Sequence, residues 1–77
     1  MTRGEQIRIR ASGSSDHWTL ATVELVSANG VSVGLRLYGM VRAHGGFIAG
    51  ALPLLIDHEA GTVTGLLGEE YEIEVFR

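Results

Sequence analysis

The stretch from Ala43 to Gly61 reads AHGGFIAGALPLLIDHEAG, and the fold depends on whether its apolar run is a strand or a helix. A helix could begin with Pro53 at its first position and end at Gly61, because proline and glycine suit those positions. A strand would instead cover Leu52–Asp57. Gly50 and Pro53 both weaken a long helix, and we therefore predict a strand.

The rest of the chain alternates between apolar and polar residues, as strands do when one face lies in the core. Polar and glycine-containing segments separate the alternating runs. The Asn29-Gly30 pair predicts a type I′ hairpin turn, whose two central residues need positive φ. Five or six short antiparallel strands with glycine turns predict a small all-β barrel. The expected strands are Glu5–Ala11, Trp18–Val26, Val31–Tyr38, Leu52–Asp57, Thr62–Leu67 and Tyr71–Phe76, with Met40–His44 as a short strand or an ordered loop.

The first and last expected strands carry opposite charges on matching faces. Arg8 and Arg10 alternate with isoleucines near the N-terminus, and Glu72 and Glu74 alternate with apolar residues near the C-terminus. Opposite charges on paired strands contribute roughly 0.2–1 kcal/mol each. Pairing of these strands could close the barrel within one chain, or it could join two chains.

Length and composition predict a single domain over residues 1–77 that associates with itself. A chain this short buries only about 60% of the surface that its unfolded form exposes, so its core is marginal. The sequence has no cysteine, which excludes disulfide support. We therefore expect a homo-oligomer, most simply a dimer. Some leucines and isoleucines should then remain exposed on one barrel, among Leu52, Leu54, Ile56, Leu66 and Leu67.

The charge pattern limits the classes of partner. The net charge is −3 and the six basic residues are scattered arginines, whereas binding to nucleic acid needs clustered positive charge. No apolar run approaches the ~20 residues of a membrane span. The three histidines lack the spacing of a metal site, and no cofactor motif is present. We expect a cytoplasmic protein without a metal or cofactor, and neither nucleic acid nor a membrane as its partner.

The opening of the chain resembles SH3-like barrels of Tudor type. Residues RGEQIRIR (3–10), a polar loop, Trp18 and then Ala21-Thr22-Val23 are similar to the start of that family. The resemblance covers about half of the chain and implies a small SH3-like barrel. It implies no function, because such folds carry many functions.

A second resemblance gives the alternative interpretation. His44-Gly45-Gly46, an apolar run and then Asp57 are similar to the hotdog-fold acyl-CoA thioesterases. The resemblance implies an α+β fold with a central helix near residues 47–60. It also implies that the Gly46 N–H polarises the thioester carbonyl and that Asp57 acts as a general base or orients the water.

The preferred interpretation is a non-catalytic barrel module that self-associates and binds a protein or a small ligand. No complete catalytic set supports an enzyme, and Asp57-His58-Glu59 is typical of a polar turn. The candidate contact residues for a ligand or partner are Trp18, Tyr38, His44 and Phe47.

Overall fold

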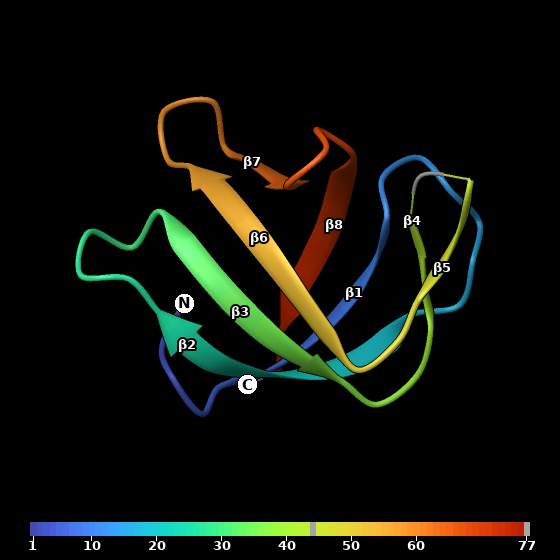
Figure 1. The fold of residues 1–77 in the computed structure, drawn as a ribbon, viewed down its shortest axis with the longest axis horizontal. Coiled ribbons are helices and arrows are strands. Elements are labelled where there is room, and N and C mark those ends of the chain that lie inside the picture. The colour runs from blue at the N-terminus through green and yellow to red at the C-terminus, as the bar shows by residue number, and fades with distance from the viewer. Residues whose placement is uncertain (44, 77) are drawn as a thin grey trace.

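The structure, a computed structural model, describes residues 1–43 and 45–76. The described residues form strands and connecting turns, and none of them lies in a helix (Figure 1). No helix that could cross a membrane is therefore present in this part of the chain. The all-β prediction is confirmed. The strands are β1 (Gln6–Ala11), β2 (Thr19–Val26), β3 (Ser32–Leu37), β4 (Val41–Ala43), β5 (Gly46–Ile48), β6 (Ala51–Asp57), β7 (Thr62–Gly65) and β8 (Glu70–Val75).

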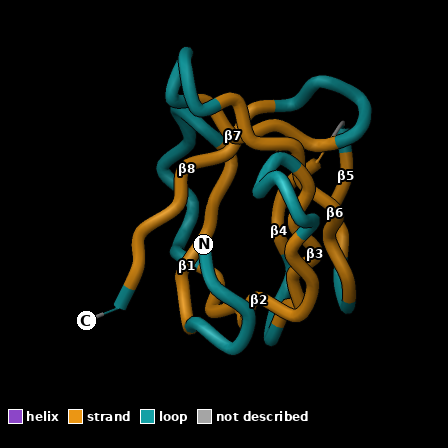
Figure 2. Tube along the Cα trace, turned by 90° about the vertical axis from the view of Figure 1, so that its left-hand side faces the viewer, coloured by secondary structure: helices purple, strands orange, loops and turns teal. Residues whose placement is uncertain are grey.

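Six of these strands close into an antiparallel barrel. Their order is β1-β2-β3-β6-β7-β8, and β8 pairs back onto β1, while β4 and β5 form a separate hairpin. Figures 1 and 2 show this hairpin at one end of the barrel. The six barrel strands confirm the expectation of a small barrel of five to six strands. Full closure leaves no unpaired edge among the barrel strands, which removes a common route to aggregation.

The charged stripes meet where the barrel closes. Arg8 stands opposite Glu74 and Arg10 stands opposite Glu72 in the β1–β8 register. The Arg8 Nε donates a hydrogen bond to Glu74 Oε2 at 3.0 Å. The Arg10 Nε donates to Glu72 Oε2 at 2.7 Å. The stripes therefore pair within a single chain, which was one of the two arrangements expected from the sequence.

The hotdog interpretation required a helix near residues 47–60, and this prediction is wrong. This region contains β5, a turn, and β6, which pairs with β3 and β7. Gly50 has a φ of +85°, which breaks a helix. Side chains along β6 alternate in burial, with Leu52 and Leu54 in the core and Pro53 and Leu55 outside. This period of two belongs to a strand.

The core fills the interior of the barrel with inward-facing aliphatic side chains. Tyr71 also lies there, and its hydroxyl has no hydrogen-bond partner among the described residues. Burial, and then the nearby Glu69 carboxylate, raise the pKa of the Tyr71 phenol. The buried hydrophobic residues are Ile7, Ile9, Ala21, Val23, Val33, Leu35, Leu37, Val41, Ala43, Leu52, Leu54 and Tyr71.

A β-bulge at Glu24 changes which side chains of β2 face outward. Val23 pairs with Leu35 and Leu25 pairs with Gly34, so Glu24 is an extra residue in the register. Strict alternation would place Leu25 in the core beside Val23. The bulge turns it outward instead, and Leu25 is 69% exposed.

The β2–β3 turn differs from the predicted type I′ turn in one respect. The Gly30 N–H donates to the Ser27 carbonyl at 3.0 Å, so Ala28 and Asn29 are the central residues. Gly30 follows them with a φ of +73°, and the Asn29 Oδ1 accepts from the Val31 N–H at 3.1 Å. The sequence therefore identified the residue that needs positive φ, but it misplaced the centre of the turn by one position.

We expect Gly30→Val to destabilise the fold by about 1–3 kcal/mol, because a β-branched residue is strained at positive φ. Chemical denaturation measures the change. Gly46→Val is the matched control, since Gly46 has no positive φ and an added Cβ there meets nothing within 4 Å. An equal loss in both variants would contradict this explanation.

Candidate ligand-binding cleft

The structure brings together two of the four candidate contact residues. Trp18 and Phe47 line the same cleft, although 29 positions separate them in the sequence. Tyr38 lies elsewhere, where its hydroxyl is 2.9 Å from the Thr22 Oγ1. His44, the fourth candidate, falls outside the described residues. The candidate site is therefore the cleft beside Trp18 and Phe47.

The cleft lies between the β1–β2 loop and the β4–β5 hairpin. The Thr19 Oγ1 donates to the Met40 carbonyl at 2.7 Å, which ties the start of β2 to the segment before β4. The cleft has a volume of about 250 Å³. Its lining is formed by Arg10, Ala11, Asp16, His17, Trp18, Thr19, Met40, Val41, Arg42 and Phe47.

A bidentate ion pair spans the two sides of the cleft. The Arg42 Nε donates to Asp16 Oδ2 at 2.8 Å, and a terminal nitrogen of Arg42 donates to Asp16 Oδ1 at 3.2 Å. Hydrogen bonding from Arg42 lowers the pKa of Asp16, desolvation partly opposes this, and the positive charges of Arg42 and Arg10 lower it further. The same hydrogen bond raises the pKa of Arg42. The cleft thus stabilises a carboxylate in its ionised form.

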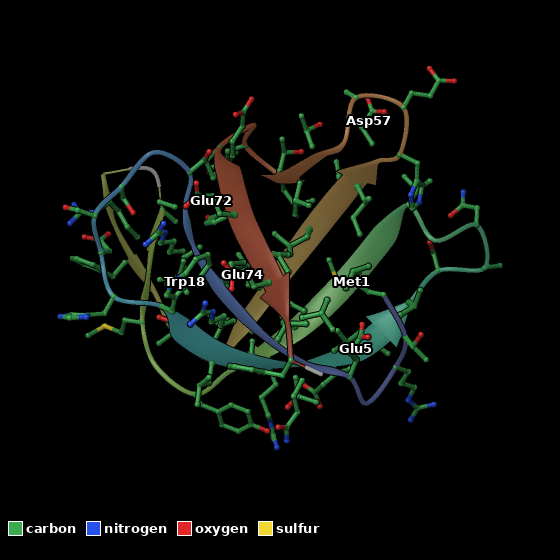
Figure 3. All side chains as sticks on the ribbon, turned by 180° about the vertical axis from the view of Figure 1, so that it is seen from behind. Met1, Glu5, Trp18, Asp57, Glu72 and Glu74 are labelled. Atoms are coloured by element: carbon green, nitrogen blue, oxygen red, sulfur yellow. The ribbon has the colours of Figure 1, made fainter. Side chains whose placement is uncertain are left out.

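Aromatic rings cover the arginines of the cleft. The Arg10 guanidinium carbon lies 4.2 Å from the centre of the Trp18 ring, and that of Arg8 lies 4.7 Å from it. Arg42 lies 5.1 Å from the centre of the Phe47 ring. Such cation–π contacts attract each guanidinium to the face of its ring. Arg8 and Arg10 also hydrogen-bond Glu74 and Glu72, which Figure 3 labels together with Trp18, so the closure of the barrel helps to position the tryptophan.

The structure places the residues of the alternative catalytic interpretation on different elements. Gly46 pairs with Ala43 in the β4–β5 hairpin. Asp57 lies at the end of β6, well separated from Trp18 in Figure 3. Its Oδ1 accepts the backbone N–H groups of Glu59 and Ala60, both at 3.0 Å. Asp57 therefore holds the β6–β7 turn, as the polar-turn interpretation expected. No group of three or more candidate metal ligands occurs within residues 1–43 and 45–76.

Sequence reasoning missed the charged half of the cleft. In the sequence, Asp16 and His17 fall in the polar loop before Trp18, and Arg42 falls in the short expected strand or loop Met40–His44. Asp16 and Arg42 lie 26 positions apart, and no periodic pattern connects a loop residue to a residue in a short hairpin. The alternation that reveals strands gives no information about how such loops pack on the barrel.

Comparisons of this chain with protein-family models, with curated proteins and with solved structures found no match.

We expect the Asp16 carboxyl to titrate below its usual value of 3.8 in an NMR pH titration. The pKa of Asp16 is lower in the folded chain than in the unfolded chain, so the ion pair stabilises the fold at pH values above the usual pKa. This stabilisation is lost as the pH falls through the pKa of Asp16 in the folded chain. Arg42→Gln should raise the midpoint of the Asp16 titration, because it removes the hydrogen bond that lowers the pKa. Arg36→Gln is the control, because Arg36 is exposed and lies outside the cleft. A midpoint at or above 3.8 in the unmodified chain would rule out the electrostatic description of this cleft.

Proposed function

We propose that this barrel is a non-catalytic binding module whose cleft recognises an acidic side chain of a partner protein. The observation that carries the proposal is the state of Asp16. The cleft already binds this carboxylate through Arg42, and Arg10 lies close enough to favour its charged form. A site that binds a carboxylate of its own chain has the chemistry to bind one from another protein.

The size of the cleft supports a side chain over a complete small molecule. Pockets that enclose drug-sized ligands have volumes of about 300–1,000 Å³, whereas this cleft has about 250 Å³. An aspartate or glutamate side chain fits such a space, and the partner's backbone would then lie across the mouth.

The remaining lining residues could contact two parts of the partner, its acidic side chain and a neighbouring apolar residue. Arg10 bonds Glu72 through Nε, and a guanidinium has further N–H donors. The terminal nitrogens of Arg10 donate to no other described side chain, and they could bind an incoming carboxylate beside Arg42. Met40 and Phe47 are 64% and 59% exposed. Their apolar surfaces suit a hydrophobic residue next to the acidic one. The preferred ligand is therefore an acidic residue followed or preceded by an apolar residue.

Trp18 is the only tryptophan of the chain and lines the cleft, so its fluorescence reports binding directly. The probe is N-acetylglutamate with its α-carboxyl blocked as a methylamide, and the corresponding N-acetylglutamine methylamide is the neutral control of similar shape. We expect saturable fluorescence change with the glutamate compound alone, and weaker binding in Arg42→Gln. Asp16→Asn should bind about two- to fivefold more tightly, because it removes the chain's own carboxylate, which competes for Arg42 through an exposed and therefore weak ion pair.

Two results would reject the proposal. The first is an equal response to both compounds, which would mean that the carboxylate is not recognised. The second is tighter binding to the unmodified chain than to Asp16→Asn, which would mean that Asp16 supports binding and does not compete with it. Added salt should weaken the binding, since the interacting charges are exposed.

A further inference from the structure

A second concave surface adjoins the cleft on the outer face of β1 and β2. This apolar slot has a volume of about 340 Å³, and none of its lining residues is charged. Three large side chains in it are exposed, Leu20 to 53%, Tyr38 to 63% and Phe76 to 48%. The slot is lined by Gln6, Ile7, Leu20, Ala21, Tyr38 and Phe76.

Backbone hydrogen bonds hold the two aromatic residues at opposite sides of the slot. The Tyr38 N–H donates to the Leu20 carbonyl of β2 at 2.9 Å, and the Phe76 N–H donates to the Gln6 carbonyl of β1 at 3.2 Å. The Tyr38 hydroxyl also lies 2.9 Å from the Thr22 Oγ1. β1 and β2 are paired with each other, so Tyr38 borders the slot on the β2 side and Phe76 borders it on the β1 side.

The slot is continuous with the cleft. Leu20 stands opposite Arg8 in the β1–β2 register. The Arg8 guanidinium carbon lies 4.7 Å from the centre of the Trp18 ring, which lines the cleft, and 5.9 Å from the centre of the Phe76 ring, which lines the slot. The lining of the cleft includes Thr19, and the lining of the slot includes the next residue, Leu20. A ligand that leaves the cleft past Trp18 therefore passes over Arg8 and reaches the slot.

A segment that crosses this face needs contacts through its side chains. Each barrel strand has a paired neighbour on both sides, so a peptide cannot add to the barrel as a further strand and obtain main-chain hydrogen bonds. An exposed ion pair contributes little by itself. Recognition of one acidic residue in the cleft therefore needs a second contact, and burial of an apolar side chain supplies a larger contribution.

We propose that the partner segment whose acidic residue occupies the cleft continues over Arg8 and places an apolar side chain in the slot. The inference rests on the proposed function, because one segment occupies both sites. This apolar residue is additional to the one beside the acidic residue, which contacts Met40 and Phe47. Alternate residues of an extended segment point to the same side and advance about 3.3 Å per residue, so we expect the two anchors to lie about two or four positions apart.

Peptides blocked at both ends test the proposal. The probes are Glu-Ser-Leu and Glu-Ser-Ser-Ser-Leu, each compared with a peptide that has serine in place of leucine and with one that has glutamine in place of glutamate. Calorimetry measures the affinities, and Trp18 fluorescence reports occupation of the cleft. We expect the leucine to tighten binding about tenfold at one of the two spacings, as partial burial of such a side chain predicts.

Leu20→Ala and Tyr38→Ala should each remove most of the gain that the leucine gives. Leu25→Ala is the matched control and should keep the full gain, because Leu25 is an exposed leucine on the same strand that lines neither the cleft nor the slot. Circular dichroism shows whether each variant remains folded, and all three side chains lie outside the core.

Two outcomes would overturn the second anchor and leave the proposed function standing. In the first, the glutamate peptides bind more tightly than the glutamine peptides, but the leucine adds nothing at either spacing. In the second, the gain from the leucine persists in Leu20→Ala and Tyr38→Ala, so the leucine binds elsewhere. Equal binding of the glutamate and glutamine peptides is a different result, which would reject the proposed function and the two-anchor ligand together.

Discussion

Closure of the sheet between the first and last strands is the constraint on which the other features of this chain depend. β1 and β8 are far apart in sequence, and their pairing completes the wall around the core. The four charged residues on the outside of this seam contribute roughly 0.2–1 kcal/mol per pair. Ile7 and Ile9 on its inside are fully buried, and burial of such a side chain contributes about 1.5–3 kcal/mol. Apolar burial therefore drives closure, and the charges help to select the register.

The same seam positions the cleft. Arg10 hydrogen-bonds Glu72 on one side and lies against Trp18 on the other, so the ion pair that borders the closure also supports the tryptophan. The β4–β5 hairpin completes the cleft from the opposite side through the Asp16–Arg42 pair. A separate concavity over β2, β3 and β6, which includes Leu25, Gly34 and Leu55, has no charged residue in its lining. One barrel therefore presents a charged, aromatic concavity and an uncharged, apolar one.

The sequence predicted the strands well because one face of each strand is buried, and this burial leaves a period of two. It also predicted the complementary stripes of the end strands. It failed where backbone irregularity or loop packing decides the outcome. Alternation places Leu25 inside, and only the bulge at Glu24 explains its exposure. The expected strand Thr62–Leu67 ends at Gly65, where the turn to Glu69 begins. The sequence indicates Trp18 and Phe47 as contact residues, but their position in one cleft depends on how the β4–β5 hairpin folds back onto the barrel. Local sequence patterns carry no information about this packing.

Closure within one chain is tested most directly by isotope-filtered NMR on an equal mixture of labelled and unlabelled protein. The paired residues Ile9 and Ile73 are suitable reporters, because their backbones lie side by side in the seam. We predict cross-strand NOEs between these residues in the fully labelled sample, and none between labelled and unlabelled molecules of the mixture. NOEs between Ile9 of one molecule and Ile73 of another would show that the end strands join two chains. That result would contradict a barrel closed by its own β1 and β8.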